Sequence, residues 1–157
     1  MTMPAVGEMA PDFTLETDSG TPLTLSALRG KPVVLFFYPK DDTSGCTTES
    51  CEFRDLVPRF DGVDARVLGI SPDPVKSHVK FRDKYQLNYP LLADVEKTVS
   101  TTYGVWQQKS MYGRKYMGVA RTTFVIGRDG RIAHVFEKVK PAGHAAEVAD
   151  VVARLPK

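Results

Sequence analysis

The residues best suited to chemistry are two cysteines, Cys46 and Cys51, the only cysteines in the 157-residue chain. Cys46 follows a Pro- and Gly-containing loop at residues 39–45, and it stands where the sequence predicts the start of a helix. A helix N-terminus presents unpaired N–H groups and the positive end of the helix dipole. A thiolate is stabilised at such a position, and the thiolate is the nucleophilic form of cysteine. Cys46 is therefore predicted to be reactive rather than a buried structural thiol.

Several residues close to Cys46 are candidates to assist it. Thr43 lies three positions earlier, near enough to accept a hydrogen bond from the sulfur or to orient an incoming oxygen. Pro39 stiffens the loop, and Gly45 allows the chain to enter the helix closely. Glu49 is most simply an acid that complements the helix dipole, and it also has the spacing of a capping box with Cys46 as the N-cap. A direct catalytic role for Glu49 is the third alternative.

The spacing of the two cysteines has a geometric consequence. Five residues along an ideal helix separate two Cα atoms by roughly 8.5 Å. A disulfide tolerates a Cα–Cα distance of no more than about 7 Å. If Cys46 and Cys51 lie in one intact helix, they can bond only after the first turns unwind. This spacing is unsuited to a structural disulfide but suits a redox switch.

The elements that must position these residues alternate along the chain. The apolar run at residues 32–38 predicts a central strand that is covered on both faces. The sequence predicts further strands at 12–16, 22–25, 65–71, 91–93, 121–126 and 131–137. It predicts helices from Cys46 onward, at 74–85, near 95–103 and at the C-terminal end. We therefore expect an α/β fold with a central mixed β-sheet flanked by helices, because the last two strands are joined too tightly to be parallel.

Two helix ends and one segment need separate interpretation. Pro58 is expected to end or kink the cysteine helix near Val57, and Asp73 is expected to be the N-cap of the helix at 74–85. Residues 104–118 contain aromatic, Met, Gln, Lys and Arg side chains. They are interpreted as an ordered surface loop with a few anchoring aromatics, or alternatively as the rim of a substrate or partner site.

Composition limits the remaining choices. The length favours one domain over residues 1–157, and 42% hydrophobic with 25% charged residues is ordinary for a globular chain. A net charge of +2 gives no reason to expect nucleic acid, and no apolar run approaches a membrane span. His78, His134 and His144 show no ligand spacing, so no metal site is expected. No secretion signal is visible, and we expect a cytoplasmic location.

The motif P-x-x-x-T-x-x-C, formed by Pro39, Thr43 and Cys46, resembles the active-site motif of the peroxiredoxins. With Cys51 five residues later, the chain is similar to the bacterioferritin comigratory protein (Bcp) or PrxQ subfamily. The resemblance extends to G-x-x-A-P-D-F-T-L at 7–15, V-V-L-F-F-Y-P-K at 33–40, C-T-T-E-S-C-E-F-R-D at 46–55, Y-P-L-L-A-D at 89–94 and R-T-T-F-V-I at 121–126.

This resemblance implies a thioredoxin-like fold and a peroxidase that reduces hydrogen peroxide and organic hydroperoxides without a cofactor. It implies that Cys46 is the peroxidatic cysteine and that Cys51 is the resolving cysteine, which forms an intramolecular disulfide. Arg121 matches the family's active-site arginine, and thioredoxin or a similar dithiol would be the reductant. Some relatives carry the resolving cysteine in the helix at 74–85, where this chain has none. We expect a monomer.

Two other classes of protein share parts of this pattern. A thioredoxin-like disulfide reductase would explain the fold, but it requires C-x-x-C, whereas this chain has four residues between its cysteines. A redox-regulated binding or sensor protein would use the same switch without efficient peroxide turnover. Peroxide consumption coupled to thioredoxin distinguishes all three classes.

Overall fold

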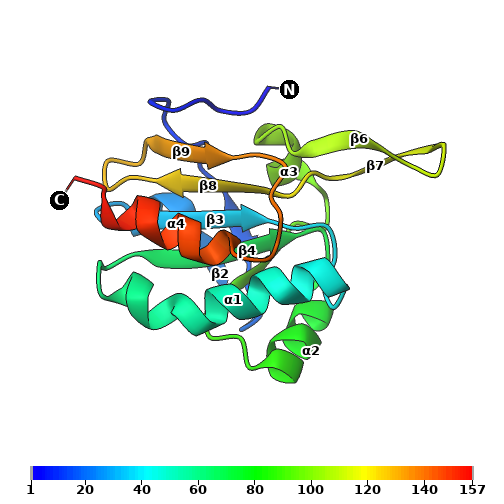
Figure 1. The fold of residues 1–157 in the computed structure, drawn as a ribbon, viewed down its shortest axis with the longest axis horizontal. Helices are drawn as coiled ribbons and strands as arrows, with labels where there is room; N and C mark the ends of the chain where they lie inside the picture. The colour runs from blue at the N-terminus through cyan, green and yellow to red at the C-terminus, as the bar shows by residue number, and fades with distance from the viewer. Residues whose placement is uncertain (1, 157) are drawn as a thin grey trace.

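The computed structural model describes residues 2–156 and is built around a five-stranded sheet of order β5-β4-β3-β8-β9 (Figure 1). β3 is parallel to β4, β4 is parallel to β5, and β8 is antiparallel to both β3 and β9. The strands are β3 (Val33–Phe37), β4 (Arg66–Ser71), β5 (Leu91–Ala93), β8 (Thr122–Ile126) and β9 (Ile132–Phe136). The predicted mixed sheet is therefore confirmed.

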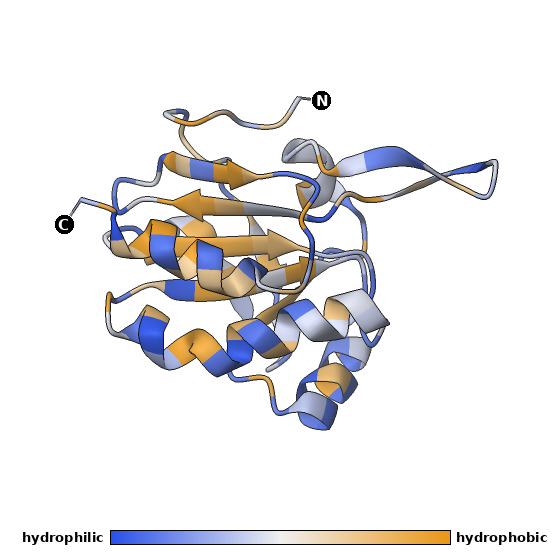
Figure 2. Ribbon diagram, in the orientation of Figure 1, coloured by the Kyte–Doolittle hydropathy of each residue, from blue (hydrophilic) through white to orange (hydrophobic). Residues whose placement is uncertain are grey.

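The central strand β3 is buried on both faces, as its apolar run predicts. Val34 and Phe36 belong to the core on one side of the sheet, whereas Leu35 and Phe37 belong to the core on the other side. Gly69 on the neighbouring strand makes room for Phe36, because a Cβ at that position would lie 2.9 Å from the Phe36 ring. The orange strands in Figure 2 show that hydrophobic residues concentrate in this sheet.

Helices cover both faces of the sheet. One core joins the sheet to α1 (Ser44–Asp61), α2 (Val75–Tyr85) and α4 (His144–Ala153). The opposite core contains the short helix α3 (Thr98–Thr102) and the strands β1 (Thr14–Glu16) and β2 (Pro22–Thr24), with the 3-10 helix η1 (Leu25–Leu28) after them. None of the four α-helices in the described part of the chain combines the length and the apolar character that crossing a membrane requires.

Two helices begin later than the sequence predicts. α2 is preceded by Pro74 as N-cap, so the prediction of Asp73 in that role is wrong by one residue. The Asp73 carboxylate instead accepts hydrogen bonds from the Ser71 hydroxyl and from the N–H of Asp41. α3 begins at Thr98 rather than near residue 95, and the Asp94 carboxylate accepts hydrogen bonds from the N–H groups of Val99 and Ser100 in its first turn.

The prediction that Pro58 ends the cysteine helix near Val57 is wrong, because α1 continues to Asp61. A proline inside a helix lacks the N–H that would bond the carbonyl four residues earlier, here the carbonyl of Arg54. The side-chain amide of Asn88 donates to that carbonyl at 3.3 Å. Asn88, which lies 30 positions after Pro58, therefore replaces the backbone N–H donor that the proline lacks.

The interpretation of residues 104–118 as a loop is also wrong. The segment forms a two-stranded antiparallel ribbon of β6 (Trp106–Met111) and β7 (Arg114–Val119), which is not part of the central sheet. Figure 1 shows this ribbon projecting from the body of the molecule, on the side where α1 begins. The alternation that marks such strands is hidden in the sequence because both faces of the ribbon carry polar residues.

Candidate active site

Cys46 lies in the first turn of α1, directly after the loop that follows β3. Thr43 is the N-cap, with extended backbone angles, and its carbonyl accepts the first helical hydrogen bond from Thr47. The expected N-cap role of Cys46 is therefore wrong, and so is the capping box with Glu49. In the described residues, the N–H groups of Gly45 and Cys46 donate to no protein acceptor. They are available to an anion or an oxygen at the helix N-terminus.

The Cys46 side chain is fully buried and faces a guanidinium group. Nη2 of Arg121 lies 3.2 Å from the Cys46 sulfur. Arg121 directly precedes β8, whose first residue pairs with the last residue of β3, so the sheet brings the two ends together. Burial lowers the pKa of Arg121, but Glu49 and Cys46 more than offset this effect, and the pKa is raised. The guanidinium therefore remains cationic and stabilises a thiolate at Cys46.

The second contact of Arg121 is an ion pair with Glu49. Nη1 of Arg121 lies 2.8 Å from Oε1 of Glu49, whose side chain is fully buried. Burial raises the pKa of Glu49 to about 7, although Arg121 opposes this shift. Oε2 of Glu49 has no hydrogen-bond partner among the described residues. Glu49 therefore positions the arginine and is itself held in an unfavourable environment.

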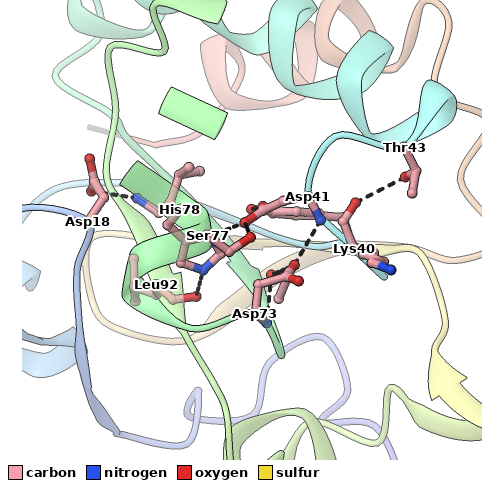
Figure 3. Close-up of polar contacts among 11 residues, drawn as sticks. Asp18, Lys40, Asp41, Thr43, Asp73, Ser77, His78 and Leu92 are labelled. Atoms are coloured by element: carbon pink, nitrogen blue, oxygen red, sulfur yellow. Dashed lines mark hydrogen bonds and ion pairs between the residues drawn. The ribbon is translucent and has the colours of Figure 1, made fainter. Parts of the chain in front are cut away.

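Gly45 packs against the Arg121 guanidinium, whereas the Thr43 hydroxyl bonds the loop before the helix. A Cβ on Gly45 would lie 3.3 Å from Nη2 of Arg121, so a glycine permits the arginine to pack against the first turn. The Thr43 hydroxyl donates to the carbonyl of Lys40 at 3.0 Å (Figure 3), and it makes no hydrogen bond to the sulfur within the described residues. Its oxygen keeps lone pairs for an incoming hydroxyl group. Pro39 occupies the start of the loop, directly after the buried Tyr38.

Cys51 lies on the same uninterrupted helix and is partly exposed, and both cysteines are free thiols. Burial raises the pKa of the Cys51 thiol, although Arg54 opposes this effect and Asp55 adds to it. The thiol form of Cys51 is therefore favoured while the helix is intact. The reduced arrangement is the one that the five-residue spacing predicts, with the two thiols on a continuous helix.

A buried polar cluster anchors the loop that carries Thr43 and leads to Cys46 (Figure 3). The Asp41 carboxylate accepts from the Tyr38 hydroxyl at 2.7 Å and from Ser77 at 2.8 Å. Nδ1 of His78 lies 2.8 Å from the same carboxylate.

The other ring nitrogen of His78, Nε2, lies 2.9 Å from the carbonyl of Leu92 on β5. Ligand atoms of Asp41, Asp73 and His78 all lie within 4.8 Å of one another, as in some metal sites. Their hydrogen bonds to neighbouring groups account for this proximity. Sequence reasoning missed the cluster because Asp41 and His78 lie 37 positions apart, with no motif linking them.

Comparison with known proteins places this geometry in context. The chain matches the AhpC/TSA family over residues 6–135. It is 52% identical over 143 residues to a putative peroxiredoxin bcp of Coxiella burnetii, covering 91% of this chain and 95% of that relative. It is 44% identical over 142 residues to peroxiredoxin Bcp of Bacillus subtilis, covering 90% of each chain.

The solved structures that resemble this chain include members of the same Bcp and PrxQ group. The bacterioferritin comigratory protein of Xanthomonas campestris, studied for its alkyl peroxide reduction activity, superposes with a TM-score of 0.86 at 39% identity over 90% of each chain. A mutant of PrxQ from Xylella fastidiosa superposes with a TM-score of 0.91 at 36% identity over 96% of each chain. The thioredoxin-like fold implied by the sequence resemblance is confirmed.

Proposed function

The chain belongs to the AhpC/TSA family as a peroxiredoxin of the Bcp type, and we propose how its residues carry out thiol-dependent peroxide reduction. Cys46 is the peroxidatic cysteine, Cys51 is the resolving cysteine, and Arg121, Thr43 and Pro39 form the peroxide site. The observation that carries the proposal is the 3.2 Å contact between Arg121 and a buried thiol in the first turn of a helix.

The first step is attack of the Cys46 thiolate on one peroxide oxygen, in line with the O–O bond. A sulfur–oxygen bond forms, the O–O bond breaks, and the leaving oxygen takes a proton to depart as water or alcohol. Negative charge moves from sulfur to oxygen in this step, and the guanidinium of Arg121 and the free N–H of Gly45 stabilise it without rearranging. Thr43 orients the incoming hydroperoxide. The product is a sulfenic acid on Cys46.

The second step joins the two cysteines. The Cys51 sulfur attacks the sulfenic sulfur of Cys46, a disulfide bond forms and the S–O bond breaks. The hydroxyl group of the sulfenic acid leaves as water, together with the proton of the Cys51 thiol. The intact helix keeps the sulfurs too far apart, so residues 44–52 must unwind first. Unwinding also removes the burial that raises the pKa of Cys51, which frees its thiolate to attack. A dithiol protein, in our proposal a thioredoxin, then reduces the disulfide by exchange.

The segment that must unwind contains buried polar atoms that lack hydrogen bonds. Two buried side-chain atoms in the described part of the chain have no hydrogen-bond partner, Oε2 of Glu49 and Oγ of Ser50. Both lie on α1 between the two cysteines, and each unsatisfied group costs about 1–3 kcal/mol in the folded state. Phe53, which stacks on Phe36 with ring centroids 4.5 Å apart, anchors the helix directly beyond this segment. The N-terminal turns are therefore predisposed to open while the rest of α1 stays in place.

Ser50→Ala is expected to stabilise the closed helix, because it removes the unsatisfied hydroxyl and keeps the backbone carbonyl that accepts from Tyr89. A gain of about 1 kcal/mol lowers the opening equilibrium about fivefold. Disulfide formation after one equivalent of peroxide should slow by the same factor, and Cys46 should be overoxidised more readily at high peroxide. Ser44→Ala, at an exposed position of the same helix, is the matched control. Unchanged disulfide formation in Ser50→Ala would contradict the role of this orphaned hydroxyl.

Opening is also expected to depend on pH through Glu49. Its pKa is about 7 in the closed helix and returns towards 4.5 when the segment unwinds, so opening releases a proton. The closed helix is therefore most stable below pH 4.5 and loses this stability as the pH rises to 7. Between pH 5 and pH 7 the opening equilibrium should rise by roughly one to two orders of magnitude.

The measurement is the rate of disulfide formation after a single equivalent of peroxide, compared between the natural protein and Glu49→Gln. Glutamine keeps the shape and the hydrogen bond to Arg121 but cannot ionise. The ratio of the two rates isolates Glu49 from other groups that titrate, including Cys51. A ratio that stays constant from pH 5 to pH 7 would show that Glu49 is not coupled to opening.

The experiment that tests the proposed function follows NADPH oxidation by thioredoxin reductase and thioredoxin in the presence of hydrogen peroxide or an organic hydroperoxide. Sustained, enzyme-dependent NADPH consumption is the expected result. A sensor or binding protein would form the disulfide once but would not sustain turnover, and the comparisons do not favour that alternative. The monomeric state and the cytoplasmic location remain predictions.

A further inference from the structure

The β6–β7 ribbon, residues 106–119, exposes large apolar side chains, and its base leads into the active site. Seven large hydrophobic residues are exposed in the described part of the chain, and four of them lie on this ribbon. The four are Met111, Tyr112, Tyr116 and Met117, with exposed fractions of 56%, 97%, 41% and 51%. Figure 2 shows that the ribbon projects away from the orange strands of the central sheet. Clustered exposed apolar residues mark interaction surfaces.

The tip of the ribbon breaks a local rule of hairpin construction. Tyr112 and Gly113 form the two-residue turn, and both have positive φ, 52° and 77°. Glycine, asparagine and aspartate are preferred in such turns, because a bulky side chain at positive φ is strained. Tyr112 makes no compensating contact within its own fold, being 97% exposed. A strained, fully exposed aromatic residue is better explained by contact with another molecule than by stability.

The ribbon is also strongly basic. It carries Lys109, Arg114 and Lys115, and no aspartate or glutamate occurs anywhere from residue 97 to residue 128. Cross-strand pairing places Lys109 opposite Tyr116, and Met111 opposite Arg114. Positive and apolar side chains therefore alternate over the same small area. Such a surface favours a partner that presents acidic groups around an apolar patch.

The ribbon is continuous with the catalytic centre. β7 ends at Val119, two residues before Arg121, whose guanidinium contacts the Cys46 sulfur. Nζ of Lys109 donates to the carbonyl of Val119 at 3.0 Å, which ties the ribbon to the residues that lead to Arg121. The base of the ribbon therefore adjoins the segment in which the disulfide forms.

We propose that the β6–β7 ribbon is the docking surface for the protein reductant, an acidic dithiol protein of the thioredoxin type that anchors on Tyr112 and its neighbours while it attacks the disulfide of Cys46 and Cys51. This inference rests on the proposed function, which requires such a reductant to reach that disulfide. A second copy of this chain fits less well, because a symmetric contact between two ribbons would bring together six positive charges and no negative ones.

The test compares variants under two reductants, an acidic thioredoxin and the small uncharged dithiol dithiothreitol. Arg114→Glu with Lys115→Glu reverses the charge of the exposed tip, and the KM for thioredoxin should rise roughly tenfold. The kcat at saturating thioredoxin and the rate with dithiothreitol should not change. The matched control is Arg66→Glu with Arg154→Glu, which changes the net charge equally at two exposed positions outside the ribbon, and its KM should stay within about twofold.

A second variant separates docking from folding of the ribbon. Tyr112→Asn places a preferred residue at the strained turn position, so the ribbon should be at least as stable as before. The KM for thioredoxin should nevertheless rise several-fold, because the exposed ring is lost. A raised KM without loss of thermal stability supports docking through Tyr112.

Several results would overturn the proposal. Equal KM values for the ribbon variants and the control would do so, as would a parallel loss of the dithiothreitol rate, which would place the ribbon in the chemistry itself. A change of oligomeric state with an unchanged KM would assign the ribbon to a second copy. Binding to anionic vesicles, lost in the variants with KM unchanged, would assign it to a lipid surface. If the natural protein showed no turnover with either reductant, the proposed function itself would fail, together with the docking proposal.

Discussion

Replacing Cys46 with serine is expected to abolish peroxide reduction, with a loss of more than about 10³-fold in kcat/KM. The hydroxyl group of serine is a far weaker nucleophile than the thiolate of cysteine. Cys51 carries the only other thiol in the chain. The Arg121 guanidinium bonds the sulfur of Cys46, and within the described residues it makes no hydrogen bond to Cys51. The measurement is the thioredoxin-coupled assay with the serine variant at several peroxide concentrations.

Cys51→Ser is the matched variant, because it removes a thiol from the same helix while leaving the peroxide site intact. It should consume one equivalent of peroxide and form a sulfenic acid on Cys46, which a dimedone adduct detects by mass spectrometry. It should form no intramolecular disulfide. Sustained thioredoxin-coupled turnover by Cys46→Ser, or an intact intramolecular disulfide in Cys51→Ser, would show that the two roles are wrongly assigned.

The second large effect is expected from Arg121. Arg121→Ala removes the group that stabilises the thiolate and the leaving oxygen, and the rate of sulfenic acid formation should fall by about 10²–10³. Arg121→Lys should recover only part of this loss. A lysine supplies a point charge, whereas the guanidinium bonds Cys46 and Glu49 at the same time through two nitrogens. Stopped-flow measurement of peroxide consumption in a Cys51→Ser background gives the rate of this step alone.

One control is essential for the Arg121 variants. Removing Arg121 leaves the buried carboxylate of Glu49 without its partner, which destabilises the site by itself. The double variant Arg121→Ala with Glu49→Gln removes that stranded charge. If catalysis depends on the guanidinium, the double variant should stay slow although its stability recovers. Recovery of the rate together with the stability would instead make Arg121 a purely structural residue.

The sequence predicts most of the fold, because its local patterns agree with the final structure. The apolar run at β3, the five-residue spacing of the cysteines and the tight turn before β9 each have one reasonable interpretation. The motif with Cys46 also predicts Arg121, but only through the family resemblance. Nothing in the spacing indicates that an arginine 75 positions later contacts the sulfur.

The predictions that fail depend on contacts between distant residues. Pro58 does not end α1, because Asn88 bonds the carbonyl that a proline leaves free. The Cys46–Glu49 capping box does not form, because Glu49 turns inward to Arg121 instead of towards the helix start. Local rules favour the simpler alternative in both cases, and the tertiary fold overrides them.

The β6–β7 ribbon fails as a sequence prediction for a different reason. Its strands are exposed on both faces, so the alternation of apolar and polar residues that identifies a strand is absent. Its turn also carries Tyr112 where sequence rules expect asparagine or glycine. Departures of this kind are expected where a segment serves contact with another molecule rather than the stability of its own fold.

The first turns of α1 are expected to open in every catalytic cycle, and hydrogen exchange reports this opening residue by residue. Amide exchange over residues 44–52 is compared between the reduced protein and the protein oxidised by one equivalent of peroxide. Protection across this segment should be lost on oxidation, while β3, β4 and the part of α1 beyond Phe53 should keep their protection. Equal protection of residues 44–52 in both forms, with the intramolecular disulfide present, would contradict it.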